Sequence, residues 1–302
     1  MTDMPCTPGG DGQRPHEEDN DSVGEGEREA EGLGTPRATQ YRPGAASNTE
    51  VDPEYLDRHP SIDGACRARI VNIMCGVFMH FTGFDLVCFQ NAVYMMDRYL
   101  SHCQKAVTPF QMNQIGVTCC YLAAKVDNLT WNLNNRCHEL ERVTGVPKEA
   151  VLSYEREILK VLEFTLNRPT PYDAVIYYHR IHLMKEVHLY AAYYACESFM
   201  LQPASIGVPV SHIAAAAILL VRRVESLTPE WMSVEEQEHW AETESDPCDI
   251  IEQADIERLA KRLAASIRVH HNRKGVEDYL GNVEKKYDCE LNCYAQHLFA
   301  DL

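Results

Sequence analysis

The sequence predicts an all-α protein of two tandem helical domains that follow a disordered acidic N-terminal tail. Three observations indicate this class: apolar residues recur at helical spacing from about residue 55 onward, no alternating strand pattern is visible, and the chain repeats weakly at an offset of 100 residues. A length of 302 residues also suits two domains of ordinary size. We therefore expect the tail at 1–54, the first domain at 55–167 and the second at 168–302.

The tail differs from the rest of the chain in composition. Residues 1–50 hold eleven Asp and Glu against four Arg, many Gly and few large apolar side chains. Such a segment cannot bury enough apolar surface to offset its conformational entropy, so we expect it to be disordered. Thr7 and Thr35 each precede a proline and are candidate phosphorylation sites for proline-directed kinases.

Helical segments follow one another in the first half. Apolar spacing predicts helices over 66–80 and 85–101. Thr108-Pro109 is an N-cap followed by proline at the first helical position, which predicts the start of a third helix. Pro147 begins another, which stops before the proline-rich stretch 167–171. That stretch is interpreted as the connection between the domains.

The internal repeat indicates a duplicated helical domain. At the offset of 100, Asp97 is matched by Glu197 and Pro109 by Pro209. After each proline comes a helix of small residues, which lets neighbouring helices approach closely. We therefore expect each of these helices to lie at the centre of its bundle.

Overall charge and hydropathy restrict the class of partner. The formal net charge is −17, which does not favour direct binding to nucleic acid, because phosphates attract clustered Lys and Arg. No run of about 18 apolar residues predicts a membrane span. The N-terminus lacks the basic-then-apolar order of a signal peptide. We expect an intracellular protein without a direct contact to nucleic acid or membrane.

The twelve cysteines are expected to be reduced thiols that pack as small apolar side chains. Cys289, Cys293 and His297 recur at every fourth position and could meet a metal ion only if a further ligand came from elsewhere. A weakly polar helix face is the favoured interpretation. The sequence therefore predicts no metal site and no cofactor.

Two opposite charges interrupt apolar helical rows. Lys125 lies one turn beyond Tyr121 at the end of the third predicted helix. Glu155 lies four residues after Val151 and four before Leu159. Both charges are therefore expected on faces that are buried or that meet a partner.

Three interpretations of these charges compete. They can form a structural ion pair, which would join two helices at a cost in desolvation. The lysine can act in catalysis through a lowered pKa, but no phosphate loop, H-E-x-x-H or nucleophile elbow accompanies it. Thirdly, the charges can flank an apolar patch that another protein covers, since interfaces gain specificity and orientation from such groups. The third interpretation is favoured.

The residues also resemble a known family. The stretches "YMMDRYLS" (94–101), "YLAAKVDN" (121–128) and "YEREILKVLEFTLNRPTP" (154–171) are similar to the cyclin box. The similarity begins around 55–71, and the ending "VEDYLGNVEKKYD" (276–288) resembles the last helix of A- and B-type cyclins. The resemblance implies two tandem five-helix cyclin boxes, the second more loosely similar than the first.

The resemblance implies a function as well. Cyclins are regulatory subunits, not enzymes, that form a heterodimer with a cyclin-dependent serine/threonine protein kinase and position its αC helix and activation loop. It further implies cell-cycle control, a nuclear location besides the cytoplasm, and contact with kinase substrates or inhibitors. The alternative is a cyclin-box scaffold or transcription-associated protein that binds a partner without activating a kinase.

The resemblance assigns the site residue by residue. The family's Lys-Glu pair falls on Lys125 and Glu155. The apolar kinase contacts around it fall on Leu122, Val126, Leu159, Phe164 and Leu166. Val126 stands where the family usually has an aromatic side chain. Arg67 and Asp97 match a second, structural charge pair inside the first box.

A substrate-docking patch of several cell-cycle cyclins is degenerate in this sequence. Its positions correspond to Cys66, Arg69, Ile70 and Ile73. Arg69 places a charge where an apolar pocket is expected, so docking of substrates with an Arg-x-Leu motif is not predicted.

Overall fold

A computed structural model describes the part of the chain that forms the helical domains. The described residues are 51–82, 87–126, 133–182, 184–228, 231, 251–272, 281–287 and 293–299. All of them belong to one compact unit, Pro36–Leu302. The candidate phosphorylation sites Thr7 and Thr35, together with Cys289 and the side chain of Cys293, lie outside the described residues.

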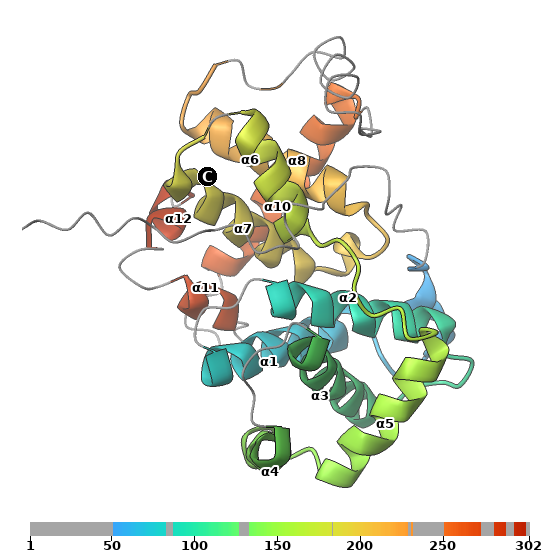
Figure 1. The fold of residues 1–302 in the computed structure, drawn as a ribbon. Helices are drawn as coiled ribbons and strands as arrows, with labels where there is room; N and C mark the ends of the chain where they lie inside the picture. Colours follow the sequence, from blue (N-terminus) through green and yellow to red (C-terminus); the bar gives the residue numbers. More distant parts are fainter. Residues whose placement is uncertain are drawn as a thin grey trace, which may run out of the picture. The chain divides into compact units, whose positions relative to one another are not determined.

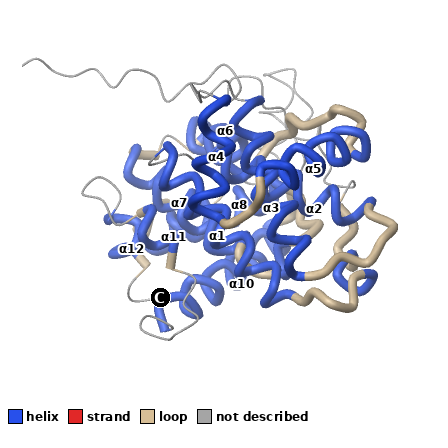
Figure 2. Tube along the Cα trace, turned by 90° about the horizontal axis from the view of Figure 1, so that it is seen from below, coloured by secondary structure: helices blue, strands red, loops and turns tan. Residues whose placement is uncertain are grey.

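Helices account for all the regular secondary structure of the described residues, and none of these residues forms a strand (Figure 2). The all-α prediction is therefore confirmed. The description begins at Val51, which is buried, and Asp52 N–H donates to Ser101 Oγ at 3.0 Å. Residues just ahead of the expected domain start therefore pack against the first helical domain.

The helices of the first bundle lie together in Figure 1. They follow the short 3-10 helix η2 (Tyr55–Arg58) and are α1 (Gly64–Thr82), α2 (Val87–His102), α3 (Pro109–Val126), α4 (Leu133–Thr144) and α5 (Lys148–Val161). Helix α3 is central, since it packs against α1, α2 and α5. Its central position agrees with the small residues along it.

Local sequence explains where α3 begins and how closely α1 approaches it. Thr108 N–H donates to Gln111 Oε1 at 3.0 Å, and Gln111 N–H donates back to Thr108 Oγ1 at 3.3 Å. This reciprocal pair satisfies donors that the first turn leaves unpaired. A Cβ atom on Gly116 would lie 2.6 Å from Ile70 Cγ2, so only glycine permits this helix contact.

The second bundle is built around α8. Its elements are α6 (Pro171–Ile181), α7 (Glu186–Met200), the 3-10 helix η3 (Pro203–Ser205), α8 (Val210–Val224), α10 (Gln253–Asn272), α11 (Asn282–Lys286) and α12 (Cys293–Leu298). Helix α8 packs against α6, α7 and α10, and its run of four alanines, 214–217, is fully buried. Thus α8 occupies in the second bundle the position that α3 occupies in the first.

The connection between the bundles is short and fixed at its far end. Helix α6 begins after Thr170, whose N–H donates to Asp173 Oδ2 at 2.8 Å in a capping box. Arg98 of α2 donates to Thr165 O at 2.8 Å, which ties the connection back to the first bundle.

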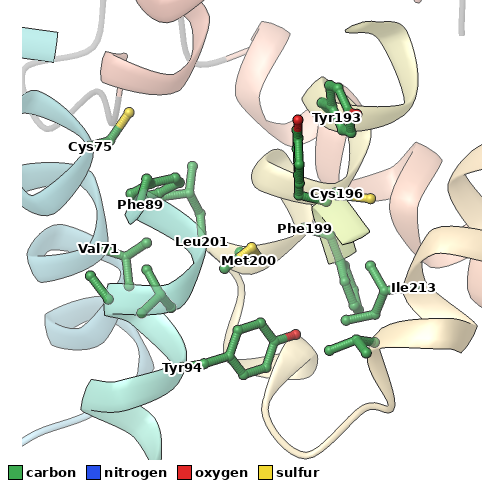
Figure 3. Close-up of a cluster of buried hydrophobic side chains, with 14 of the residues drawn as sticks. Val71, Cys75, Phe89, Tyr94, Tyr193, Cys196, Phe199, Met200, Leu201 and Ile213 are labelled. Atoms are coloured by element: carbon green, nitrogen blue, oxygen red, sulfur yellow. The ribbon is translucent and has the colours of Figure 1, made fainter. Parts of the chain in front are cut away.

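The two bundles share one apolar core. Figure 3 shows Val71 and Phe89 of the first bundle close to Met200 and Leu201 of the second, and all four belong to one buried cluster. Every described cysteine except Cys103 is buried, and all are free thiols. Burial raises the pKa of Cys75 to about 12, so this thiol stays protonated and packs as an apolar group.

Candidate functional site

The two charges singled out by the helical pattern meet in the structure. Lys125 lies in the last turn of α3 and Glu155 in the middle of α5. Lys125 Nζ is 2.5 Å from Glu155 Oε1, and their side chains are 35% and 13% exposed. The ammonium also lies 5.2 Å from the centre of the Tyr121 ring. The pair therefore lies at the surface, where both groups can still reach a partner.

The apolar residues that the resemblance assigned to the kinase contact lie at two depths. Val126 and Leu159 are half-buried, and Phe164 is 72% exposed. Leu122 and Leu166 are buried and support the surface from beneath. The apolar residues assigned to the interface therefore divide into three that a partner can touch and two that hold the helices in place.

Phe164 is presented by an unusual turn at the end of α5. Glu163 and Phe164 have φ angles of 50° and 58°, in the left-handed region that side-chain-bearing residues rarely adopt. Phe164 N–H donates to Leu159 O at 2.9 Å, which closes the turn. Such strain persists only where the surroundings impose it, and here it directs an aromatic ring into solvent.

A second ion pair of the first bundle is buried. Arg67 Nε donates to Asp97 Oδ1 at 2.9 Å, and Nη2 lies 2.6 Å from Oδ2, with both side chains at most 4% exposed. Tyr55 Oη donates to the same carboxylate at 2.8 Å. Burial alone would lower the pKa of Arg67, but the charge of Asp97 outweighs it, so the pKa is raised. The guanidinium therefore stays charged.

Arg67 also reaches the second bundle. Its Nη1 donates to Met200 O at 2.8 Å, across 133 positions of sequence. The structural pair inside the first bundle thus contributes to the junction with the second. The sequence assigned the pair but gave no indication of this contact.

A third ion pair was not recognised from the sequence. Lys286 Nζ of α11 lies 2.8 Å from Glu197 Oε1 of α7, and both side chains are at most 1% exposed. Gln90 of α2 donates to the same oxygen at 3.3 Å. Glu197 is the repeat counterpart of Asp97, so the offset of 100 residues was the signal that could have found it.

The positions of the degenerate docking patch do not form a continuous exposed patch. Cys66 and Ile70 are buried, and Cys66 Sγ lies 4.0 Å from Met112 Sδ. Arg69 and Ile73 are exposed on α1. This part of α1 therefore offers a partner the cation of Arg69 and the partly exposed side chain of Ile73.

Membrane spans and metal sites are both absent from the described residues. None of their helices has the length and apolar character needed to cross a membrane. No group of three or more His, Cys, Asp or Glu is arranged among them to hold a metal ion.

Comparison with known proteins decides the family. Residues 40–167 match the cyclin N-terminal domain, and residues 169–290 match the cyclin C-terminal domain. The chain belongs to the cyclin family. The two bundles of the fold are therefore two cyclin boxes.

Similar curated proteins are B-type cyclins. A putative cyclin-B3-1 of Arabidopsis thaliana is 29% identical over 186 residues, which are 60% of this chain and 44% of the relative. A G2/mitotic-specific cyclin-B of Emericella nidulans is 28% identical over 180 residues, 58% of this chain and 36% of the relative. This cyclin is thus a divergent member that resembles the B type, and the matched region spans less than half the length of each relative.

A solved structure has the same fold. The viral cyclin of herpesvirus saimiri superposes with a TM-score of 0.51 at 16% identity, covering 80% of this chain and 94% of the viral protein. At that identity the likeness concerns the architecture alone.

Proposed function

We propose that this cyclin is the regulatory subunit of a cyclin-dependent serine/threonine protein kinase, which it binds and activates in cell-cycle control. The observation that carries the proposal is the ion pair of Lys125 and Glu155, which is held at the surface by α3 and α5. A partly exposed pair of this kind contributes only about 0–1 kcal/mol to stability, so folding alone gives little reason to place it there.

The chemistry of the pair suits a helical partner. The lysine ammonium has three donors, of which one is used by Glu155. The remaining donors can reach acceptors on a partner, and the Glu155 carboxylate can accept from backbone N–H groups that the first turn of a partner helix leaves unpaired. Phe164, Leu159 and Val126 supply the apolar contact that drives association.

Kinase activation follows from positioning. A cyclin that presses on the kinase αC helix places the kinase's own glutamate against its strand lysine and frees the activation loop. Because Lys125 and Glu155 are already paired before the partner arrives, little side-chain entropy is lost when the kinase helix docks. A relative that is named a G2/mitotic-specific cyclin-B supports a role in cell division.

The second candidate is a cyclin-box scaffold that binds a partner without activating a kinase. Val126 favours it, since a small aliphatic side chain stands beside the pair where the family usually has an aromatic one. A smaller contact area would weaken the pressure on a partner helix. The two candidates differ in whether the captured partner phosphorylates a substrate.

The deciding experiment is affinity purification followed by a histone phosphorylation assay on the eluate. Wild-type protein is expected to recover an active kinase, and Lys125→Ala combined with Glu155→Ala is expected to recover none while its circular dichroism stays helical. The matched control is Arg223→Ala with Glu257→Ala, which removes an ion pair of similar exposure (32% and 34%) in the second box.

Two outcomes would overturn the proposal. Recovery of an active kinase by the Lys125/Glu155 double variant would remove this pair from the interface. Recovery of a partner without kinase activity by the wild type would establish the scaffold instead.

A further inference from the structure

Helix α10 has a basic outer face on an acidic chain. Its exposed cations are Arg258, Lys261, Arg262 and Arg268. The opposite face is apolar and packs against α7 and α8. Since the whole chain carries a net charge of −17, this stripe is not a consequence of composition and concentrates positive potential locally.

A cavity lies at the N-terminal half of this stripe. Its volume is about 150 Å³, and it is lined by Val208, His212, Asp255, Arg258, Leu259 and Arg262. The residues come from α10, from α8 and from the segment ahead of α8. The side chain of Arg258 is 73% exposed, so the cavity is accessible from solvent.

The two arginines of the cavity are held differently. Arg262 donates to Ala204 O at 2.6 Å, and its guanidinium carbon lies 5.4 Å from the centre of the Phe199 ring. These contacts orient one guanidinium in advance. Arg258 is paired with Asp255 of the same helix, in an exposed ion pair of the kind that contributes little to stability. Its guanidinium can therefore exchange the carboxylate for a better anion.

We propose that this cavity binds the phosphate group of a phosphorylated serine or threonine in a partner protein. Arg258 and Arg262 are one helical turn apart, so both planar groups can converge on a single anion. Guanidinium forks match the oxygens of phosphate, and the polar ring of His212 lines the same cavity. Clusters of arginine are a recurrent means of recognising phosphorylated peptides.

The remaining lining residues favour phosphate over carboxylate. Asp255 already offers Arg258 a monoanionic carboxylate, so a competing ligand needs more charge and more acceptor oxygens than Asp or Glu can provide. Val208 and Leu259 form an apolar wall that suits the aliphatic part of a phosphorylated side chain. The ligand is thus a phosphopeptide and not an acidic stretch in general.

This inference goes beyond the proposed function, because the cavity lies in the second box and the kinase surface in the first. If both hold, the cyclin retains partners that already carry a phosphate and presents them again to the bound kinase. Phosphate binding is measurable without any kinase, so the two proposals can fail independently.

The test is fluorescence anisotropy of the full chain with two labelled peptide pools. Both pools have random flanks, and the central residue is phosphothreonine in one and threonine in the other. The phosphorylated pool is expected to bind at least about tenfold more tightly, and Arg258→Gln with Arg262→Gln is expected to remove that preference. Kinase recovery by this variant should equal that of the wild type.

The matched control is Lys261→Gln with Arg268→Gln, which removes two charges from the same helix outside the cavity. It is expected to change the affinity by less than about twofold. If the loss of Arg262 unfolds the second box, Arg258→Gln alone replaces the double variant, and about a threefold weakening is expected because one of two guanidinium groups remains.

Three results would overturn the proposal. One is equal binding of the two pools. Another is an equal loss in the Lys261/Arg268 control, which would indicate general electrostatic attraction. The third is a single-stranded oligonucleotide that binds as tightly as the phosphorylated pool and is lost in the Arg258 variant, which would assign the cavity to nucleic acid.

Discussion

The first box contains two ion pairs that are alike in chemistry and opposite in environment. Arg67 and Asp97 are at most 4% exposed and carry further hydrogen bonds to Tyr55 and to the backbone of the second box. Lys125 and Glu155 are 35% and 13% exposed and are joined by one hydrogen bond. The comparison indicates that burial and the number of additional partners decide whether a charge pair serves the fold or a binding surface.

The largest effect is expected from the buried pair. Arg67→Ala leaves the Asp97 carboxylate in the core without its counter-charge, which costs about 3–5 kcal/mol of unfolding free energy. Urea denaturation followed by circular dichroism measures this. The control is Arg69→Ala, two residues along the same helix but exposed, which is expected to change stability by about 0.5 kcal/mol or less. Similar losses in both variants would contradict the assignment of a structural pair.

The third ion pair, Lys286 with Glu197, extends the comparison to the pH dependence of stability. Burial raises the pKa of Glu197 above its ordinary 4.5, and Lys286 opposes this rise. In Lys286→Ala the opposition is gone, so the folded-state pKa rises further. A raised pKa makes the folded state bind more protons than the unfolded state, so stability is lost as pH increases from about 4.5.

The variant is therefore expected to be less destabilised, relative to wild type, at pH 5 than at pH 8. Urea midpoints at the two pH values measure the difference. Lys285→Ala is the control, because its side chain is exposed on the same short helix. A destabilisation that is equal at both pH values would mean that Glu197 does not titrate in this window.

Particular elements explain how far the sequence could be interpreted. The start of α3 was predictable because a local cap specifies it, and the pattern around Lys125 and Glu155 was visible because helical spacing is a local property. Helix α4 was not predicted, since the sequence from Leu133 to Thr144 is largely polar and, among its side chains from 137 to 144, only Cys137 and Leu140 are buried. Its helical state depends on packing that no local pattern reveals.

Long-range pairings were beyond local patterns for the same reason. Lys286 and Glu197 are 89 positions apart, and Arg67 meets Met200 across 133. The cavity of the second box likewise combines residues of α8 and α10 that are far apart in the chain. The repeat predicted that Asp97 and Glu197 are equivalent positions. Only the fold shows which basic residue each of these carboxylates pairs with.

The exposed pair is expected to contribute much less to stability than the buried one. A double-mutant cycle on Lys125→Ala and Glu155→Ala should give a coupling energy of about 1 kcal/mol or less. The same cycle on Arg67 and Asp97 should give several times more, because each single variant leaves a buried charge. Equal coupling energies in the two cycles would mean that the environment does not separate the pairs as proposed.

The smallest effect on stability, and one of opposite sign, is expected at the exposed end of the same surface. Phe164 has a φ of 58°, which glycine adopts without strain, so Phe164→Gly is expected to raise the unfolding free energy by about 0.5–1 kcal/mol. The same change removes the exposed ring and should reduce kinase recovery. Thermal denaturation and affinity purification on one preparation measure both.

Phe110→Gly is the matched control, because Phe110 is 66% exposed but lies in the first turn of α3, where glycine is a poor helix former. It is expected to lower stability by a few tenths of a kcal/mol and to leave kinase recovery unchanged. If Phe164→Gly were destabilising and still recovered the kinase, the strained turn would serve the fold and not the partner. If Phe164→Gly were stabilising and recovered less kinase, α5 would end in a turn whose strain is tolerated because it presents the ring for binding.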